Sequence, residues 1–109
     1  MRHGKTLLFS LYATMLFSNA AMAEDYVLSI RNHQFIPADI TVPADKKVKL
    51  VIKNTDPTPA EFESTDLNRE KIIGASSEGV VFIGPLDPGT YHYFDDFHRD
   101  ATTGTITVK

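Results

Sequence analysis

The sequence contains no cysteine, and its three methionines all lie within the first 23 residues. The absence of cysteine excludes disulfide bonds, thiol redox chemistry, thiolate nucleophiles and every cysteine-ligated metal site. A nucleophile motif, an HExxH pair and a glycine-rich phosphate loop are also missing, so the usual signatures of hydrolases and nucleotide-binding enzymes are absent. A small domain of this kind must be stabilised by its apolar core and by any ion that it binds.

Long apolar runs are absent beyond the N-terminus. A basic start is followed by a mostly apolar stretch over residues 7–17, and Ala21-Met22-Ala23 has the small-x-small pattern after which signal peptidases cut. This stretch is shorter than the roughly 20 apolar residues that a transmembrane helix needs. We therefore predict a signal peptide over residues 1–23 and one domain over residues 24–109, with no membrane insertion after cleavage.

Positive charge is scarce. The formal net charge is -3, and cleavage would remove Arg2 and Lys5 but no acidic residue, which gives -3 - 2 = -5. Binding to the phosphates of nucleic acids requires a basic face or stripe. Here Lys47, Lys49 and Lys53 alternate with apolar residues as the solvated side of one strand. We therefore expect no nucleic-acid partner.

Short alternating segments separated by turn residues indicate β-strands, and no long helical pattern interrupts them. Residues 33–37 are predicted to bend, and residues 65–71 fit either one helical turn or an extended connection. The aromatic residues expected in the core are Tyr91, Tyr93, Phe35, Phe62 and Phe82. We predict an all-β Greek-key β-sandwich with about seven strands, at residues 26–31, 40–42, 47–53, 61–64, 80–83, 90–94 and 103–108.

Acidic and histidine side chains gather in three places: His33, then Glu61, Glu63 and Glu70, then the segment 95–100. Acidic loop residues on a small domain are commonly solvated charge and nothing more. Imidazole and carboxylate donors together suit iron, zinc, copper or manganese. The residues alone therefore support a metal site, provided that folding brings the three places together.

Several segments resemble the cupredoxins, and the resemblance covers nearly the whole predicted domain. They are Phe35-Ile36-Pro37 with residues 40–42, residues 48–54, residues 84–91, Phe97-His98 and residues 104–108. Within the cupredoxins, residues 61–64, 66–71 and 96–98 are similar to the cysteine-free periplasmic proteins of bacterial ferrous-iron uptake systems. This resemblance implies a cupredoxin-like sandwich in the periplasm that binds copper, iron or both. Its implied partners are an inner-membrane iron permease and other periplasmic iron-uptake proteins.

The sequence departs from the cupredoxin pattern at the metal ligands. Asp95 stands where that family carries its cysteine, Ala60 replaces the first histidine, and Thr102 or Thr103 replaces the methionine, which excludes a blue copper centre. Of the adjacent aspartates 95 and 96, only one is expected to point inward. The donors that remain suit Fe(II), Fe(III) or Cu(II) better than Cu(I). The metal-ligand candidates are His33, Glu61, Asp95, Asp96 and His98, which the resemblance brings to one end of the sandwich.

Two functions remain open from the sequence. In the first, the protein binds metal and assists oxidation or delivery of ferrous iron, with ferroxidase-type activity as one form of this role. In the second, the cupredoxin frame has lost its metal and docks a membrane or periplasmic partner. A copper chaperone or storage role is disfavoured because Cu(I) prefers clustered methionines, and the predicted domain has none.

Overall fold

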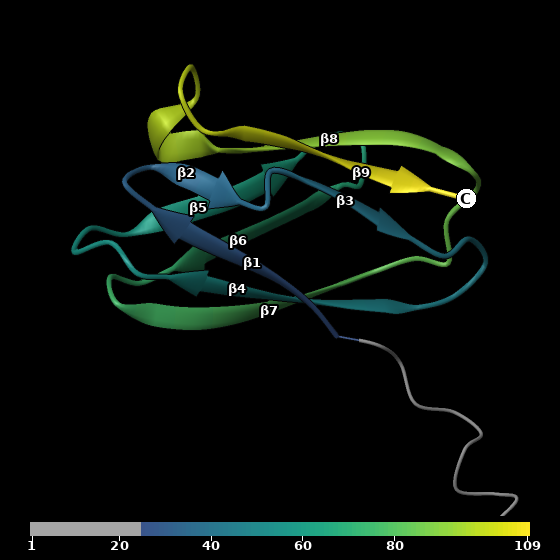
Figure 1. Cartoon of the computed structure of the whole chain (residues 1–109), viewed down its shortest axis with the longest axis horizontal. Helices are drawn as coiled ribbons and strands as arrows, with labels where there is room; N and C mark the ends of the chain where they lie inside the picture. The colour runs from purple at the N-terminus through teal and green to yellow at the C-terminus, as the bar shows by residue number, and fades with distance from the viewer. Residues whose placement is uncertain (1–24) are drawn as a thin grey trace, which may run out of the picture.

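The computed structural model describes residues 25–109, so the predicted signal peptide lies outside the described residues. The described chain forms nine strands and one short 3₁₀ turn, η2 (Asp96–His98) (Figure 1). The strands are β1 (Asp25–Arg31), β2 (Gln34–Ile36), β3 (Asp39–Val42), β4 (Val48–Asn54), β5 (Ala60–Ser64), β6 (Arg69–Ile73), β7 (Ser77–Ile83), β8 (Gly89–Asp95) and β9 (Thr103–Val108).

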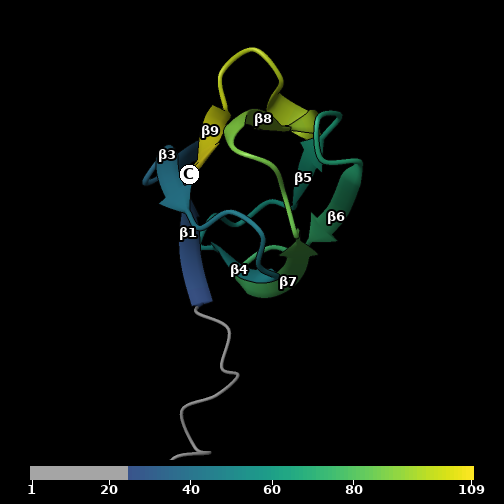
Figure 2. The same ribbon diagram turned by 90° about the vertical axis from the view of Figure 1, so that its right-hand side faces the viewer.

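The strands form two mixed sheets packed face to face. One sheet has the order β2-β1-β4-β7 and the other the order β3-β9-β8-β5-β6. Figure 2 views the sandwich end-on, with β8 and β9 on one side and β4 and β7 on the other. Two pairs, β1 with β4 and β3 with β9, are parallel, and the other strand pairs are antiparallel. The predicted all-β sandwich is confirmed.

The core lies between the sheets and follows from alternation along each strand. On β4, Leu50 and Ile52 point inward and are fully buried. An aromatic group fills the centre, where the Phe62 ring stacks on the Tyr93 ring at 5.2 Å and the Phe35 ring meets Tyr93 edge-on at 4.8 Å between centroids. Burying one such side chain contributes roughly 1.5–3 kcal/mol. This core therefore provides stability to a domain that has no cysteine for disulfides.

Three local predictions need correction or refinement. The predicted bend over residues 33–37 contains β2, because the chain reverses in two residues and then pairs back onto β1. Residues 65–71 combine the two alternatives: residues 65–68 form a turn in which the N–H of Asn68 donates to the carbonyl oxygen of Thr65 at 3.2 Å, and β6 begins at Arg69. Phe82 was expected in the core but is 46% exposed. The cause is the alternation of β7, which turns Val81 and Ile83 inward and Phe82 outward beneath Lys47.

A close backbone approach beside Tyr93 depends on glycine. The Tyr93 hydroxyl donates a hydrogen bond of 2.6 Å to the carbonyl oxygen of Ala38. A Cβ atom on Gly104 would lie 2.3 Å from that oxygen and 2.4 Å from Cζ of Tyr93. Burial raises the pKa of Tyr93, so its hydroxyl keeps its proton and remains a donor.

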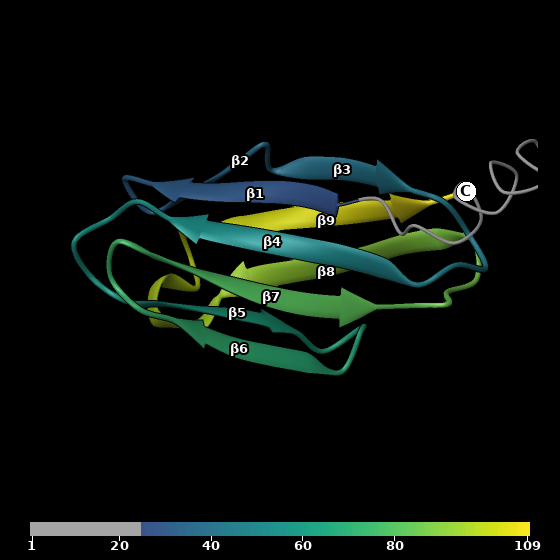
Figure 3. The same cartoon turned by 90° about the horizontal axis from the view of Figure 1, so that it is seen from below.

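Several connections meet at one end of the sandwich. The β1–β2 hairpin, the β4–β5 connection and η2 all lie at the left end of Figure 1, and Figure 3 shows the same grouping from below. Among the residues that the structure describes, no helix has the length and apolar composition needed to cross a bilayer. The grouped connections carry most of the predicted metal ligands.

Candidate metal centre

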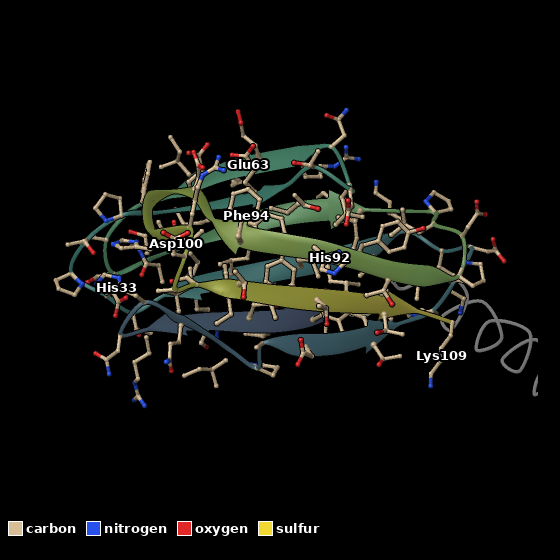
Figure 4. The ribbon with its side chains drawn as sticks, turned by 90° about the horizontal axis from the view of Figure 1, so that it is seen from above. His33, Glu63, His92, Phe94, Asp100 and Lys109 are labelled. Atoms are coloured by element: carbon tan, nitrogen blue, oxygen red, sulfur yellow. The ribbon has the colours of Figure 1, made fainter. Side chains whose placement is uncertain are left out.

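Two histidines from distant parts of the chain stack on each other at this end. His33 lies at the tip of the β1–β2 hairpin, and His98 is the last residue of η2. Their ring centroids are 3.9 Å apart, and the ring planes differ by 28°. The side chains are 46% and 31% exposed, respectively. Figure 4 shows His33 at the end of the molecule opposite Lys109. The predicted convergence of the hairpin with the 96–98 turn is therefore observed for these two rings.

The hairpin that carries His33 has an unusual backbone. Asn32 and His33 have φ angles of 51° and 58°, the left-handed region that two-residue hairpin turns require. Residues other than glycine are uncommon there because their Cβ is crowded, and asparagine and histidine are among the types that adopt it more often. Both backbone N–H groups donate to the buried carboxylate of Asp56, at 2.7 Å for Asn32 and 2.9 Å for His33. The same carboxylate lies 3.6 Å from Nδ1 of His33. Asp56 therefore holds the turn through its backbone and places a carboxylate near the imidazole.

Asp56 is itself positioned by Asn54 at the end of β4. The buried Asn54 side chain accepts the N–H of Asp56 at 3.0 Å and donates to the carbonyl oxygens of Thr58 and Gly74 at 2.9 and 3.1 Å. Burial opposes ionisation of Asp56, but the backbone N–H groups of His33 and Asn32 outweigh it and lower the pKa of this carboxyl. Asp56 is therefore a fixed negative charge behind the histidine pair.

Asp95 is the counterpart of Asp56 on the other histidine. Its side chain is completely buried, and Oδ1 accepts the N–H groups of Glu61 and Phe97 at 2.9 and 3.0 Å. The other oxygen, Oδ2, lies 3.0 Å from Nδ1 of His98. Each of the two stacked imidazoles therefore has a buried carboxylate beside its Nδ1 atom.

The buried Thr102 ties the two histidine segments together. Its hydroxyl donates to the carbonyl oxygen of His33, and its N–H donates to that of His98 at 3.0 Å. Its own carbonyl oxygen accepts the N–H of Asp95 at 2.9 Å. Thr102 is one of the two threonines that stand in place of the cupredoxin methionine, and its hydrogen bonds join the His33 segment to the His98 segment.

Asp96, unlike the buried Asp95, is partly exposed and pairs with an arginine. Its side chain is 28% exposed, and its Oδ1 atom lies 2.7 Å from Nε and 2.6 Å from Nη2 of Arg99. The guanidinium group lies in turn over the Phe94 ring at 4.9 Å. As expected for adjacent residues, only one of the two aspartates points inward, and it is Asp95.

Three glutamates form a separate cluster on the outer face of β5 and β6. One carboxylate oxygen from each of Glu61, Glu63 and Glu70 lies within 4.8 Å of the others, and within residues 25–109 no other three His, Asp or Glu ligand atoms approach this closely. Glu63 and Glu70 face each other directly across the strand pair. Partial burial, followed by the negative charges of Glu70 and Asp96, raises the pKa of Glu61.

The predicted ligand set is therefore divided between two places. His33, Asp95 and His98 lie together, whereas Asp96 is paired with Arg99. Glu61 joins the histidine site through its backbone N–H, and its carboxylate belongs to the glutamate cluster. The donor set of the histidine site is two imidazoles backed by two carboxylates, which suits Cu(II) or iron, and residues 25–109 contain no thiolate or thioether.

Sequence reasoning missed Asp56 and Asn54. The signal available was weak: Asn54-Thr55-Asp56-Pro57 follows a buried strand, and such residues are ordinary turn formers. The partner of Asp56 is a hairpin tip 23 and 24 residues away, which no local pattern indicates.

Comparison with known proteins agrees with this fold. The model of the cupredoxin-like domain family matches residues 6–108. The chain belongs to this family. An uncharacterized protein of Rickettsia prowazekii (strain Madrid E), RP394, is 43% identical to this cupredoxin-like protein over 82 residues. The match covers 75% of the present chain and 66% of the relative.

Solved cupredoxins share the fold at low sequence identity. Auracyanin A of Chloroflexus aurantiacus, described as a "blue" copper protein, has a TM-score of 0.69 at 13% identity, covering 81% of this chain and all of its own. A reduced amicyanin mutant, P94F, has a TM-score of 0.65 at 14% identity, covering 84% and 88%. A purple cupredoxin from Nitrosopumilus maritimus has a TM-score of 0.61 at 20% identity, covering 78% and 100%.

Proposed function

We propose that this cupredoxin-like protein is a periplasmic metal-binding protein. In this role it binds copper, iron or both at the His33–His98 pair and assists oxidation or delivery of ferrous iron to an inner-membrane permease. The observation that carries the proposal is the stacked pair of partly exposed imidazoles, each with a buried carboxylate beside Nδ1. A carboxylate behind a histidine orients the ring and makes it a more basic metal ligand.

The backbone at His33 supports a functional reason for this residue. A two-residue hairpin turn with two positive φ angles favours glycine or asparagine, and histidine at φ 58° is a costly choice. Asp56 holds this turn through two N–H groups, and Thr102 fixes the carbonyl oxygen of His33. These backbone contacts hold the hairpin tip that places the His33 ring against His98.

The donor types favour particular metals. Imidazole and carboxylate suit Cu(II) and iron, whereas Cu(I) prefers the sulfur donors that residues 25–109 lack. The solved neighbours support copper, since auracyanin A is described as a copper protein. Held by His33 and His98, Cu(II) would supply a one-electron acceptor for the substrate Fe(II): each ion pair would give Fe(III) and Cu(I). The carboxylates of Glu61, Glu63 and Glu70 lie on the neighbouring face, where their charge favours the harder Fe(III) product.

Location and partners rest on the sequence. The signal-peptide pattern of residues 1–23 supports export. The similarity of residues 61–64 and 66–71 to cysteine-free proteins of ferrous-iron uptake supports an iron permease and other periplasmic iron-uptake proteins as partners. Two of these residues, Glu63 and Glu70, lie opposite each other in the structure and border a polar hollow with Asn68 and Arg69.

A metal-free docking module is the second candidate, and a specific observation favours it. The outer face of the β2-β1-β4-β7 sheet carries a row formed by Val27, Val51 and Val80, and Phe82 lies beside this row. The side chains of Val27, Val80 and Phe82 are 40–46% exposed. Such a face would be available to the permease even if the histidine pair held no metal.

Anaerobic calorimetry of the metal-free processed protein separates the two candidates. We expect Cu(II), Fe(II) or both to bind, and binding to be lost in His98→Ala and in His33→Gly, which keeps a turn that glycine readily adopts. His92→Ala is the matched control, because His92 is exposed and pairs with Asp66 away from the site. If the intact protein binds neither metal, the docking module replaces the present proposal.

Iron uptake in cells gives the corresponding biological test. A strain carrying both Asp96→Ala and His98→Ala should take up ferrous iron poorly while exporting normal amounts of the protein. Uptake equal to that of the unaltered strain would contradict a role for this end of the molecule in iron handling.

A further inference from the structure

We propose that Asp95 is a positioning residue and not a metal ligand, and that it makes Nε2 of His98 the atom that binds the metal. This inference rests on the proposed function, because it concerns which ring nitrogen of the same histidine pair binds the metal. It assigns to Asp95 a different role from the ligand role that the resemblance implies.

The burial and the hydrogen bonds of Asp95 leave an ion little access to its carboxylate. Oδ1 accepts two backbone N–H groups, from Glu61 and Phe97, and Oδ2 faces Nδ1 of His98 at 3.0 Å. The Asp95 side chain is fully buried, whereas the His98 ring that it contacts is partly exposed. Oδ2 keeps a second lone pair, but an ion could reach it only if the segments that bury Asp95 moved apart.

The chemistry of the contact fixes the tautomer of His98. Oδ1 of Asp95 accepts two N–H groups, and we assign the same acceptor role to Oδ2, which places the hydrogen on Nδ1 of His98 at this distance. A neutral imidazole with hydrogen on Nδ1 has its free electron pair on Nε2. Within residues 25–109, Nε2 of His98 has no hydrogen-bond or ion-pair partner. Nε2 is therefore the nitrogen that is available to an ion.

Asp56 supports His33 through the backbone and not through a hydrogen bond to the ring. Its distance of 3.6 Å to Nδ1 is too long for a hydrogen bond, but its carboxylate accepts the His33 N–H at 2.9 Å and fixes the hairpin turn. The Nδ1 sides of both stacked rings thus face buried carboxylates. Nε2 of His33 is likewise without a partner in the described part of the chain.

Asp95→Asn tests the role of Asp95 with little change in shape. Because Oδ1 must keep accepting the N–H groups of Glu61 and Phe97, the new amide nitrogen takes the place of Oδ2 and donates toward His98. This favours the tautomer with hydrogen on Nε2, which blocks that nitrogen as a ligand. Asp66→Asn is the matched control, since Asp66 accepts the N–H of His92 at 2.8 Å and lies 3.0 Å from its Nδ1 outside the site.

The first readout needs no metal. Long-range ¹H–¹⁵N NMR of the metal-free protein at about pH 8, where a free imidazole is neutral, reports which ring nitrogen carries hydrogen. We expect hydrogen on Nδ1 of His98 in the intact protein and on Nε2 in Asp95→Asn, with no change at His98 in Asp66→Asn. Hydrogen on Nε2 of His98 in the intact protein would overturn the inference.

The second readout is Cu(II) affinity, measured by calorimetry on the same proteins. We expect Asp95→Asn to weaken binding about 10–100-fold, the usual effect of removing such a supporting carboxylate, and Asp66→Asn to leave it unchanged. If Cu(II) binds equally well to Asp95→Asn, the inference fails and the proposed function stands. If the intact protein binds no Cu(II) or Fe(II), the proposed function fails, and the positioning role fails with it.

Discussion

The adjacent aspartates Asp95 and Asp96 offer a sharp test of how this end of the molecule is built. Asp95→Ala would remove the buried carboxylate that accepts the N–H of Glu61 and caps η2 through the N–H of Phe97, in two partly buried hydrogen bonds. The lost cap costs about 0.5–2 kcal/mol and the unpaired Glu61 donor about 1–3 kcal/mol, so we expect a loss of about 1.5–5 kcal/mol. Small domains are stable by only about 5–15 kcal/mol, so this variant should unfold at much lower denaturant concentration.

Asp96→Ala is the natural comparison for this measurement. It removes one partly exposed ion pair with Arg99, and such pairs contribute about 0–1 kcal/mol. Urea unfolding of the metal-free proteins, followed by tyrosine fluorescence or circular dichroism, gives both values on one scale. An Asp95→Ala protein within about 1 kcal/mol of the intact one would refute the hydrogen-bond argument. A larger loss in Asp96→Ala than in Asp95→Ala would refute it equally.

Two further predictions concern packing and charge. Gly104→Ala should lose about 1–3 kcal/mol in urea unfolding, because its Cβ would lie 2.3 Å from the Ala38 oxygen, whereas Gly74→Ala, whose nearest contact is at 3.6 Å, should unfold like the intact protein. The pKa of Glu61, measured by carboxyl ¹³C NMR, should lie above the ordinary value for glutamate and should fall in Glu70→Gln, which removes one neighbouring negative charge. Because folding raises the pKa of Glu61, the ionised side chain destabilises the folded state at pH values above that pKa. This destabilisation is lost as the pH falls through the folded-state pKa and Glu61 takes up a proton. A Glu61 titration midpoint that does not move in Glu70→Gln would contradict the charge argument.

The fold could be predicted from the sequence because its signals are local and repeated. The alternation of Val48, Leu50 and Ile52 with lysines fixes the inner face of β4, and the same period identifies β8 and β9. Strands β2 and β6 were harder, because β2 has three residues and β6 is exposed at four of its five positions. A strand that buries one side chain leaves almost no periodic signal.

The site could be predicted only in part, because its construction is not local. His33 and His98 stood out as imidazoles on a bend and a turn, and the structure stacks them. The carboxylate that supports each ring could not be chosen by pattern. Asp56 reaches a hairpin tip formed by a distant segment, and whether position 95 or 96 points inward depends on where β8 ends. These facts follow from tertiary contacts that alternation does not encode.

The placement of His33 and Lys109 at opposite ends of the sandwich has a practical consequence. If the protein is attached to a surface through its C-terminal residue, directly or by an affinity tag, the histidine pair lies at the far end of the domain and faces the solution. Sensor-chip measurements of metal and partner binding can therefore be made on the immobilised protein without shielding the pair. Attachment through the β1–β2 hairpin would instead place the histidine pair against the surface. Comparing partner binding in the two orientations would show which end of the domain the partner contacts.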